Sequence, residues 1–452
     1  MLYIPRTLFI FRGPRGSPIS VQDCLPMVLS SELLQDALRS SNKLLFECYG
    51  SLIRCYQECV ELRKDNKDRT KSQDYWDAEF VGSVIKQLAE MLNYRDANAT
   101  RLLNVALTHR QRLHLDPDEI EFVLSSYWRQ LNTDIEVGDT FSSSALDCLE
   151  PAIKLIIGYK TNEDFLLLLH RLSSQVEQMA RPASQTEHTA LQNVLTLLAL
   201  FAKCSLSSVK GAMLNEHFEV ISVSVALRLP EPKDLAYSGH ALRLLEAQRN
   251  LAGNRTVPLT GESLDCLLSS MLDIDIKHLI SHGGSWQQFV DLYSALTDNL
   301  IVLLKQHSNL MSDRAAQLSV LCQDLIQAVV GYRAERKQTQ DISETELDGL
   351  ADLGLKLATV MATVRATQAL AVKRVAPFLL IFTIRQMVAT ERPTTLFEKI
   401  KVHIVRVCHE LIGICDHRAG HFILRSSNEA GARMYEGLVK DHEKYHKFRG
   451  KV

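Results

Sequence analysis

The residues best suited to chemistry gather in the last part of the chain, where a cysteine and histidine cluster precedes a basic terminus. The cluster holds Cys408, His409, Cys415, His417 and His421. Thiolates and imidazoles bind zinc, and His417 and His421 are four residues apart, as on one helix face. Structural zinc sites use closely paired ligands such as Cys-x-x-Cys, however, and this sequence has no such pair. We therefore expect core cysteines and surface histidines without a metal.

The basic terminus, residues 444–452, carries most of the candidate binding residues. It contains four Lys and Arg residues and no acid, with aromatic residues between them. Cations neutralise phosphates and aromatic rings stack on bases, so this composition favours RNA or an acidic partner. A plain helix end explains the same residues equally well, because cations interact favourably with the negative, C-terminal end of the helix dipole. The candidate RNA- or partner-binding residues are Arg433, Lys444, Tyr445, Lys447, Phe448, Arg449 and Lys451.

Charge is unevenly distributed along the 452 residues. Residues 363–452 contain 16 Lys and Arg against 8 Asp and Glu, a net charge of +8, whereas the whole chain has a net charge of -2. The remaining residues therefore carry a net charge of -10. An acidic body with a basic end favours an anionic partner at that end, and a solvated charged face is the alternative.

Motifs of common enzyme classes are missing from the sequence. It has neither a GxxxxGK[ST] phosphate loop nor a GxSxG nucleophile motif. His409 and Glu410 begin an HExxH zinc-protease motif, but Gly413 stands where the second histidine is needed. The carboxylates of Asp273 and Asp275 lack the context of a catalytic pair. We predict no catalytic residues and no cofactor.

Helices are the elements predicted to position these residues. Glycine (20) and proline (12) are scarce for this length, which disfavours turn-rich β folds. Ser343 and Glu346 form a capping box that starts a long helix, and Pro377 must kink or end it. Helical spacing of apolar residues predicts a buried stripe at Ile400, Ile404, Val407, Leu411 and Ile414.

One stretch disagrees with the helical pattern. Ile221, Val223, Val225, Leu227 and Leu229 alternate with small or polar residues, which is the period of a strand. A lone strand would have no partner, so we predict a buried helix.

The predicted fold is all-α, an irregular helical-repeat array of antiparallel helices that resembles an α-solenoid. Prolines and polar residues at 229–262 indicate a boundary. We therefore divide the chain into an atypical N-terminal segment (1–20), a helical region (21–235) and a C-terminal helical domain (236–452). No apolar run reaches the roughly 18 residues of a transmembrane helix, so we expect no membrane partner. Cysteines without disulfide-framework spacing favour a reducing compartment, cytosol or nucleus.

The final segment also resembles a known family. Its helix ending at 411–416, its segment 430–435 with Arg433 and its closing run 441–448 are together similar to the C-terminal domain of the nucleolar pre-ribosomal-associated, or unhealthy ribosome biogenesis, proteins. The resemblance is to the second member of that pair. Residues 369–387 resemble the helix that the family places before this ending.

This resemblance implies an all-helical nucleolar scaffold of early large-subunit ribosome precursors that supports pre-rRNA processing. The implied partners are pre-ribosomal particles, a larger helical-repeat nucleolar protein and a DEAD-box helicase, and the implied location is the nucleolus. The family supplies no catalytic residue. Two alternatives stay open: a cytosolic helical-repeat adaptor that binds only protein, and a metal-dependent enzyme that uses the cysteine and histidine cluster.

Overall fold

The structure is a computed structural model that describes residues 117–118, 120–126, 143–178, 185–335, 342–388 and 396–446. The chain forms two compact units, Met1–Thr161 and Asn162–Val452. In the part of the chain that is described, every regular element is a helix and none is a strand. The predicted all-α class is therefore confirmed. The predicted N-terminal segment, residues 1–20, lies outside the described residues.

The first unit is described at helical residues 120–126 and at α8 (Ser143–Tyr159). Val123 and Leu124 are buried in the first of these stretches, and Ile153 and Ile156 are buried in α8. Both stretches thus present one apolar face, as amphipathic helices of a packed unit do.

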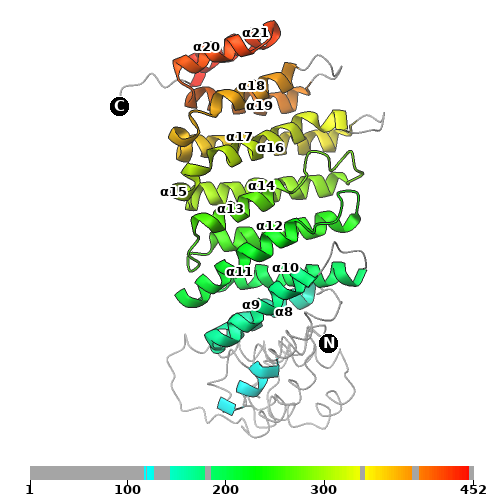
Figure 1. Cartoon of the computed structure of the whole chain (residues 1–452). Coiled ribbons are helices and arrows are strands. Elements are labelled where there is room, and N and C mark those ends of the chain that lie inside the picture. The colour runs from blue at the N-terminus through cyan, green and yellow to red at the C-terminus, as the bar shows by residue number, and fades with distance from the viewer. Residues whose placement is uncertain are drawn as a thin grey trace, which may run out of the picture. The chain divides into compact units, whose positions relative to one another are not determined.

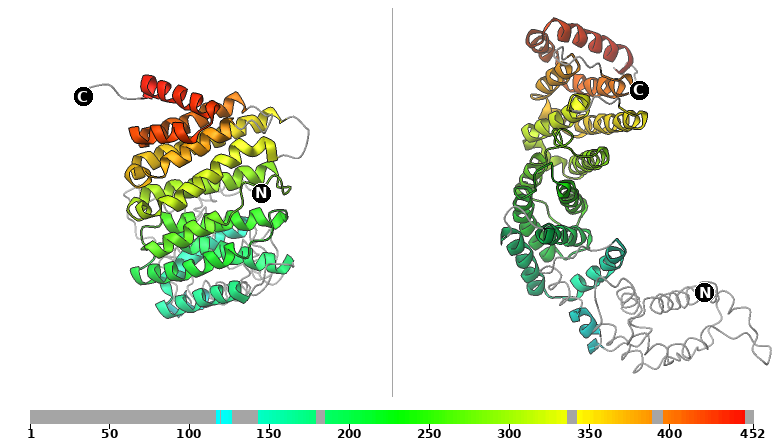
Figure 2. Two further views of the ribbon diagram at one scale, coloured as in Figure 1. Left: turned by 45° about the horizontal axis from the view of Figure 1, so that its top comes forward. Right: turned by 90° about the vertical axis from the view of Figure 1, so that its right-hand side faces the viewer.

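The second unit is built from two layers of helices, in which each helix packs against the next one of its own layer (Figures 1 and 2). One layer contains α9 (Asn162–Gln178), α11 (Ser208–Ala226), α13 (Gly261–Leu272), α16 (Ala315–Glu335), α18 (Ala376–Val388) and α20 (His417–Ser426). The other contains α10 (Gln185–Lys203), α12 (Leu235–Gly253), α14 (Trp286–Gln306), α17 (Glu344–Val372), α19 (Glu398–Ile414) and α21 (Glu429–Asp441). Alternation of successive helices between two stacked layers is the arrangement of an α-solenoid, so the predicted helical-repeat fold is confirmed.

Three short elements complete the second unit. Helix α15 (Ser308–Met311) and the 3-10 turn η1 (Ser312–Arg314) connect α14 to α16. The π-helical turn η2 (His442–His446) follows α21 and contacts α19.

The buried stripe predicted near residue 400 is present in α19. Its members Ile400, Ile404, Val407, Leu411 and Ile414 are all buried, with Ile414 the most exposed at 7%. Because the stripe recurs every three or four residues, its members lie on one face of α19. Burial of this face packs α19 against α17 and α18.

Local signals placed two helix boundaries correctly. The Ser343 side chain accepts a hydrogen bond from the backbone N–H of Glu346, and the Glu346 side chain accepts one from the backbone N–H of Ser343, so the capping box is present at the start of α17. The long helix ends at Val372, and Pro377 is the second residue of the next helix, α18. A proline is tolerated there because the first helical N–H groups have no partner inside the helix.

The stretch with strand period is helical, as predicted. Residues 221–226 belong to α11, where Ile221 and Val225 are buried four residues apart. Leu227, in contrast, is 62% exposed at the C-cap. The alternating apolar residues therefore do not all lie on one buried face, as they would in a strand.

The predicted boundary between residues 235 and 236 lies inside the second unit. Helix α10 packs against α12 and α11 packs against α13, so contacts cross it on both layers. The proposed division into domains remains a prediction. No described helix has both the length and the apolar composition needed to cross a membrane.

Candidate functional site

The cysteine and histidine cluster is divided between the core and the surface. Cys408 is fully buried on α19, and burial raises the pKa of its thiol to about 12. Burial, followed by the nearby Asp416 carboxylate, also raises the pKa of Cys415 to about 12. Since the thiolate is the metal ligand, both environments disfavour metal binding. His417 and His421 are exposed on α20.

The described residues contain no group of three or more His, Cys, Asp or Glu side chains arranged to hold a metal ion. The burial of Cys408 and the exposure of His417 and His421 agree with the expected core and surface positions. That the protein binds no metal remains a prediction.

His409 instead anchors the end of the chain. It is buried on α19, and its ring centroid lies 5.9 Å from that of His442, which is also buried and begins η2. The expectation of surface histidines is therefore wrong for His409, which is buried. Its contact with His442 could not be predicted, because the two residues lie on different elements and His442 stands in a polar stretch of the sequence. The contact fixes where the basic terminus leaves the folded unit.

Of the predicted binding residues, Arg433, Lys444 and Tyr445 are described and exposed. The guanidinium of Arg433 forms an ion pair with Glu429, one turn earlier on α21. The Lys444 Nζ atom lies 4.7 Å from the centroid of the Tyr445 ring, which is 66% exposed. Lys444 and Tyr445 are therefore the described residues of the set that offer a cation and a ring to a ligand. The others, Lys447, Phe448, Arg449 and Lys451, lie outside the described residues.

The positive charge of the C-terminal part is concentrated in two short segments. Residues 396–446 contain eight Lys and Arg against seven Asp and Glu, and are almost neutral. Residues 363–388 contain four Lys and Arg and no acid, and residues 447–452 contain three and no acid. The first of these segments belongs to α17 and α18, which sequence analysis had not singled out as a binding element.

A cationic and aromatic surface lies where α18 and α20 pack side by side. The two helices run in the same direction, as shown by two contacts between them and one between the residues just before them. Lys373 Nζ lies 3.4 Å from Asp416, the Phe378 and Phe422 ring centroids are 5.2 Å apart, and Arg385 donates to the Ser426 carbonyl at 2.9 Å. We name this the α18–α20 surface. Its exposed residues on the two helices are Phe378, Arg385, Arg418, Phe422 and Arg425, and we include the exposed residues Leu370, Lys373 and Arg374 from the end of α17 and the turn after it, where Lys373 pairs with Asp416.

One sequence signal could have revealed this surface. Arg418, Phe422 and Arg425 follow one another at helical spacing, and all three are exposed on one face of α20. An aromatic residue between two arginines on an exposed face is unusual for a purely solvated helix. Phe378, in contrast, lies within the mostly apolar residues 375–384, so its exposure could not be predicted.

Comparison with protein-family models gives one match to this end of the chain. The model of the Urb2/Npa2 family matches residues 242–451. Residues 242–451 are therefore similar to the Urb2/Npa2 family, and we call them the Urb2/Npa2 region. The match confirms the family resemblance of the final segment, and it assigns the region to ribosome biogenesis. The Urb2/Npa2 region includes most of α12 and every later described helix, and therefore the α18–α20 surface. It also includes the basic terminus up to residue 451.

Other comparisons are distant. The crystal structure of SYS-1 has a TM-score of 0.34 and 10% sequence identity, over 80% of this chain and 62% of that chain. The crystal structure of an engineered protein has a TM-score of 0.29 and 10% identity, over 94% of this chain and 99% of that chain. The chain thus spans 62% of the length of the SYS-1 chain. No curated protein matches this chain in sequence.

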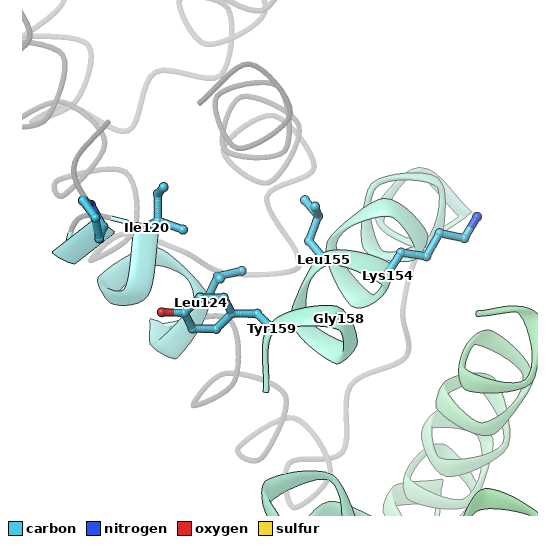
Figure 3. A pocket seen from close by; sticks show the side chains of 7 residues that line it. Ile120, Leu124, Lys154, Leu155, Gly158 and Tyr159 are labelled. Carbon is cyan, nitrogen blue, oxygen red and sulfur yellow. The ribbon is translucent and has the colours of Figure 1, made fainter. Parts of the chain in front are cut away.

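The first unit contains a pocket of about 470 Å³, outside the Urb2/Npa2 region (Figure 3). Ile120, Leu124, Leu155 and Tyr159 contribute apolar walls. The charged residue at its edge is Lys154, whose amine forms an ion pair with Glu150 at 2.8 Å. Because binding sites for polar ligands use several converging polar groups, this lining does not define a catalytic site.

Proposed function

We propose that this protein is a non-enzymatic nucleolar assembly factor for early large-subunit ribosome precursors, and that it supports pre-rRNA processing as a helical scaffold. The observation that carries the proposal is the Urb2/Npa2 match over residues 242–451. The role in ribosome biogenesis follows from the match. The proposal adds three points to this role: the protein is located in the nucleolus, it acts on precursors of the large subunit, and it serves as a scaffold.

The architecture of the second unit supports a scaffold role. Helices stacked in two layers expose a series of helix faces to solvent, and solenoids use such extended surfaces to bind partners. A scaffold needs binding faces and no catalytic residues, which agrees with the absence of common enzyme motifs from the sequence. The proposed partners are pre-ribosomal particles, a larger helical-repeat nucleolar protein and a DEAD-box helicase.

The basic terminus is proposed to contribute contacts to pre-rRNA. The His409–His442 contact holds the start of η2 against α19, and Lys444 and Tyr445 are exposed just beyond it. Three further cations follow in residues 447–452. Cations close to an exposed aromatic ring suit single-stranded RNA, since the cations neutralise phosphates while the ring stacks on a base.

Depletion of the protein from cells tests the proposal, with pre-rRNA measured by RNA hybridisation. We expect unprocessed precursors of large-subunit rRNA to accumulate, while precursors of small-subunit rRNA mature normally. If the protein is instead a cytosolic adaptor that binds only protein, its depletion should leave both sets of precursors unchanged. Microscopy of the tagged chain should then find it outside the nucleolus.

A further inference from the structure

The α18–α20 surface exposes more apolar area than a solvated helix face needs. Leu370 is 90% exposed, Phe378 is 56% exposed and Phe422 is 40% exposed. The two phenylalanine rings pack edge to face at an interplanar angle of 61°, so their exposed parts form one continuous patch. Adjacent exposed aromatic residues on a soluble protein mark interaction sites, because burying them is favourable.

The same surface carries positive charge that the described residues do not neutralise. No described carboxylate lies within ion-pair distance of Arg374, Arg418 or Arg425. Lys373 is paired with Asp416, and Arg385 donates to a backbone carbonyl. Arginine binds carboxylates through two parallel hydrogen bonds, so this excess charge favours an acidic partner.

The arrangement of helices favours an elongated partner. Helices α18 and α20 run side by side in the same direction, as shown by the Phe378–Phe422 and Arg385–Ser426 contacts and by the Lys373–Asp416 ion pair just before them. Helix α18 has 13 residues, which corresponds to a length of about 20 Å. A partner helix of about four turns would cover this length, with apolar residues spaced every three or four positions against Phe378 and Phe422 and its end toward Leu370, which precedes α18 at the end of α17.

We propose that the α18–α20 surface docks an acidic amphipathic helix of a partner protein. The apolar stripe of that helix covers Leu370 and the two phenylalanines, and its carboxylates pair with the surrounding arginines. A protein helix fits better than RNA, because Leu370, one turn before Lys373 at the end of α17, is 90% exposed and an aliphatic side chain cannot stack on a base. The docking surface goes beyond the proposed function and does not depend on it, since the argument uses only side chains of α17, α18 and α20.

Photo-crosslinking in cells identifies the class of molecule that covers this surface. Phe422 in the full chain is replaced by p-benzoylphenylalanine, and the control carries the same group in place of Leu227, which is 62% exposed at the end of α11. We expect an adduct at position 422 that resists ribonuclease, is absent from the control and maps to an acidic amphipathic segment of another protein. An RNA adduct, a protein adduct without acidic amphipathic character, or no adduct above the control would overturn the proposal.

A direct titration then tests the assigned contacts. The crosslinked segment is synthesised as a fluorescent peptide, and its binding to the purified full chain is measured by anisotropy. We expect Leu370→Ser and Phe378→Ser each to weaken binding about tenfold or more, and Arg374→Glu with Arg418→Glu to weaken it further. The matched controls Leu227→Ser and Arg171→Glu, at exposed positions on α11 and α9, should leave affinity unchanged.

Equal affinity of the surface variants and the controls would contradict the proposal. Circular dichroism of each variant shows that helix content is preserved, which separates a local effect on binding from unfolding of the protein. The result is independent of the pre-rRNA experiment, because a chain that fails to affect pre-rRNA processing can still bind the peptide.

Discussion

His409 and His442 lie together in the core of the second unit, with their ring centroids 5.9 Å apart, and they join α19 to the turn from which the basic terminus leaves. The two residues are 33 positions apart, so the contact depends on the folding of α20 and α21 between them. Lys444 and Tyr445 follow at once and are exposed. The terminus therefore begins at a fixed place on the solenoid, and substitutions beyond His442 should change binding without changing the fold.

The stripe of α19 should be sensitive to charge. Leu411 is 1% exposed and Ile414 is 7% exposed, so Leu411→Asp or Ile414→Asp buries a carboxylate without a partner. We expect either change to lower the free energy of unfolding by about 3–5 kcal/mol, as measured by urea denaturation. The control is Val402→Asp on the same helix, where the side chain is 59% exposed and the cost should be small. Similar stabilities for all three variants would show that the stripe does not face the core.

Replacement by alanine should have opposite effects on stability at two glycines in neighbouring helices. A Cβ atom on Gly211 in α11 would meet the backbone carbonyl oxygen of Thr256, so Gly211→Ala forces the backbone apart. We expect it to cost about 1–3 kcal/mol of stability. A Cβ atom on Gly239 in α12 meets nothing within 4 Å, so Gly239→Ala should stabilise the protein by about 0.5–1 kcal/mol through helix propensity. Thermal melting distinguishes the pair, and equal shifts would contradict the close approach at Thr256.

His240 should make stability depend on pH. Burial lowers the pKa of His240 below its ordinary value, against the opposing hydrogen bond between its Nε2 atom and the His188 carbonyl at 2.9 Å. Because the folded-state pKa is lowered, the unfolded chain binds the proton more readily. The stabilising contribution is therefore present above the unfolded pKa of about 6.5 and is lost as pH falls through it toward the folded pKa.

Urea denaturation between about pH 8 and about pH 5 measures this effect. We expect stability to fall on acidification, and His240→Gln to fall less steeply than the unchanged chain. His217 contributes in the same direction, since burial lowers its pKa as well. An equal slope for His240→Gln would assign the pH dependence to other groups.

What the sequence could predict depended on how far apart the interacting residues lie. The stripe through Leu411 follows from helical spacing alone, and the capping box at Ser343 involves residues three positions apart. The Phe378–Phe422 and His409–His442 contacts join different helices, so no local pattern specifies them. The Arg433–Glu429 ion pair is a different case, because its spacing of one helical turn is visible in the sequence.

Removal of four charges from the basic terminus should weaken RNA binding. We expect Lys444, Lys447, Arg449 and Lys451 changed together to Gln to reduce affinity for pre-rRNA in filter-binding titrations. The slope of log affinity against log salt should fall by about one unit for each phosphate that the variant no longer neutralises. Tyr445→Ala should weaken binding by about 1–3 kcal/mol with little change of slope if the ring stacks on a base.

A matched control removes the same charge elsewhere. Its four changes to Gln are at exposed cations distant in sequence from the terminus, Arg171, Arg255, Lys305 and Arg406. We expect this control to bind RNA more tightly than the terminal variant. Equal affinity and slope for the terminal variant and the unchanged chain would show that the terminus is only a helix end, and that any ribosomal role depends on protein contacts.

Affinity purification of the tagged full chain from cells tests the central claim most directly, with the bound RNA identified by sequencing. The account predicts that early large-subunit pre-rRNA is enriched together with assembly factors of those particles, while mature rRNA and small-subunit precursors are not. Recovery of the chain with proteins but without large-subunit pre-rRNA would contradict it.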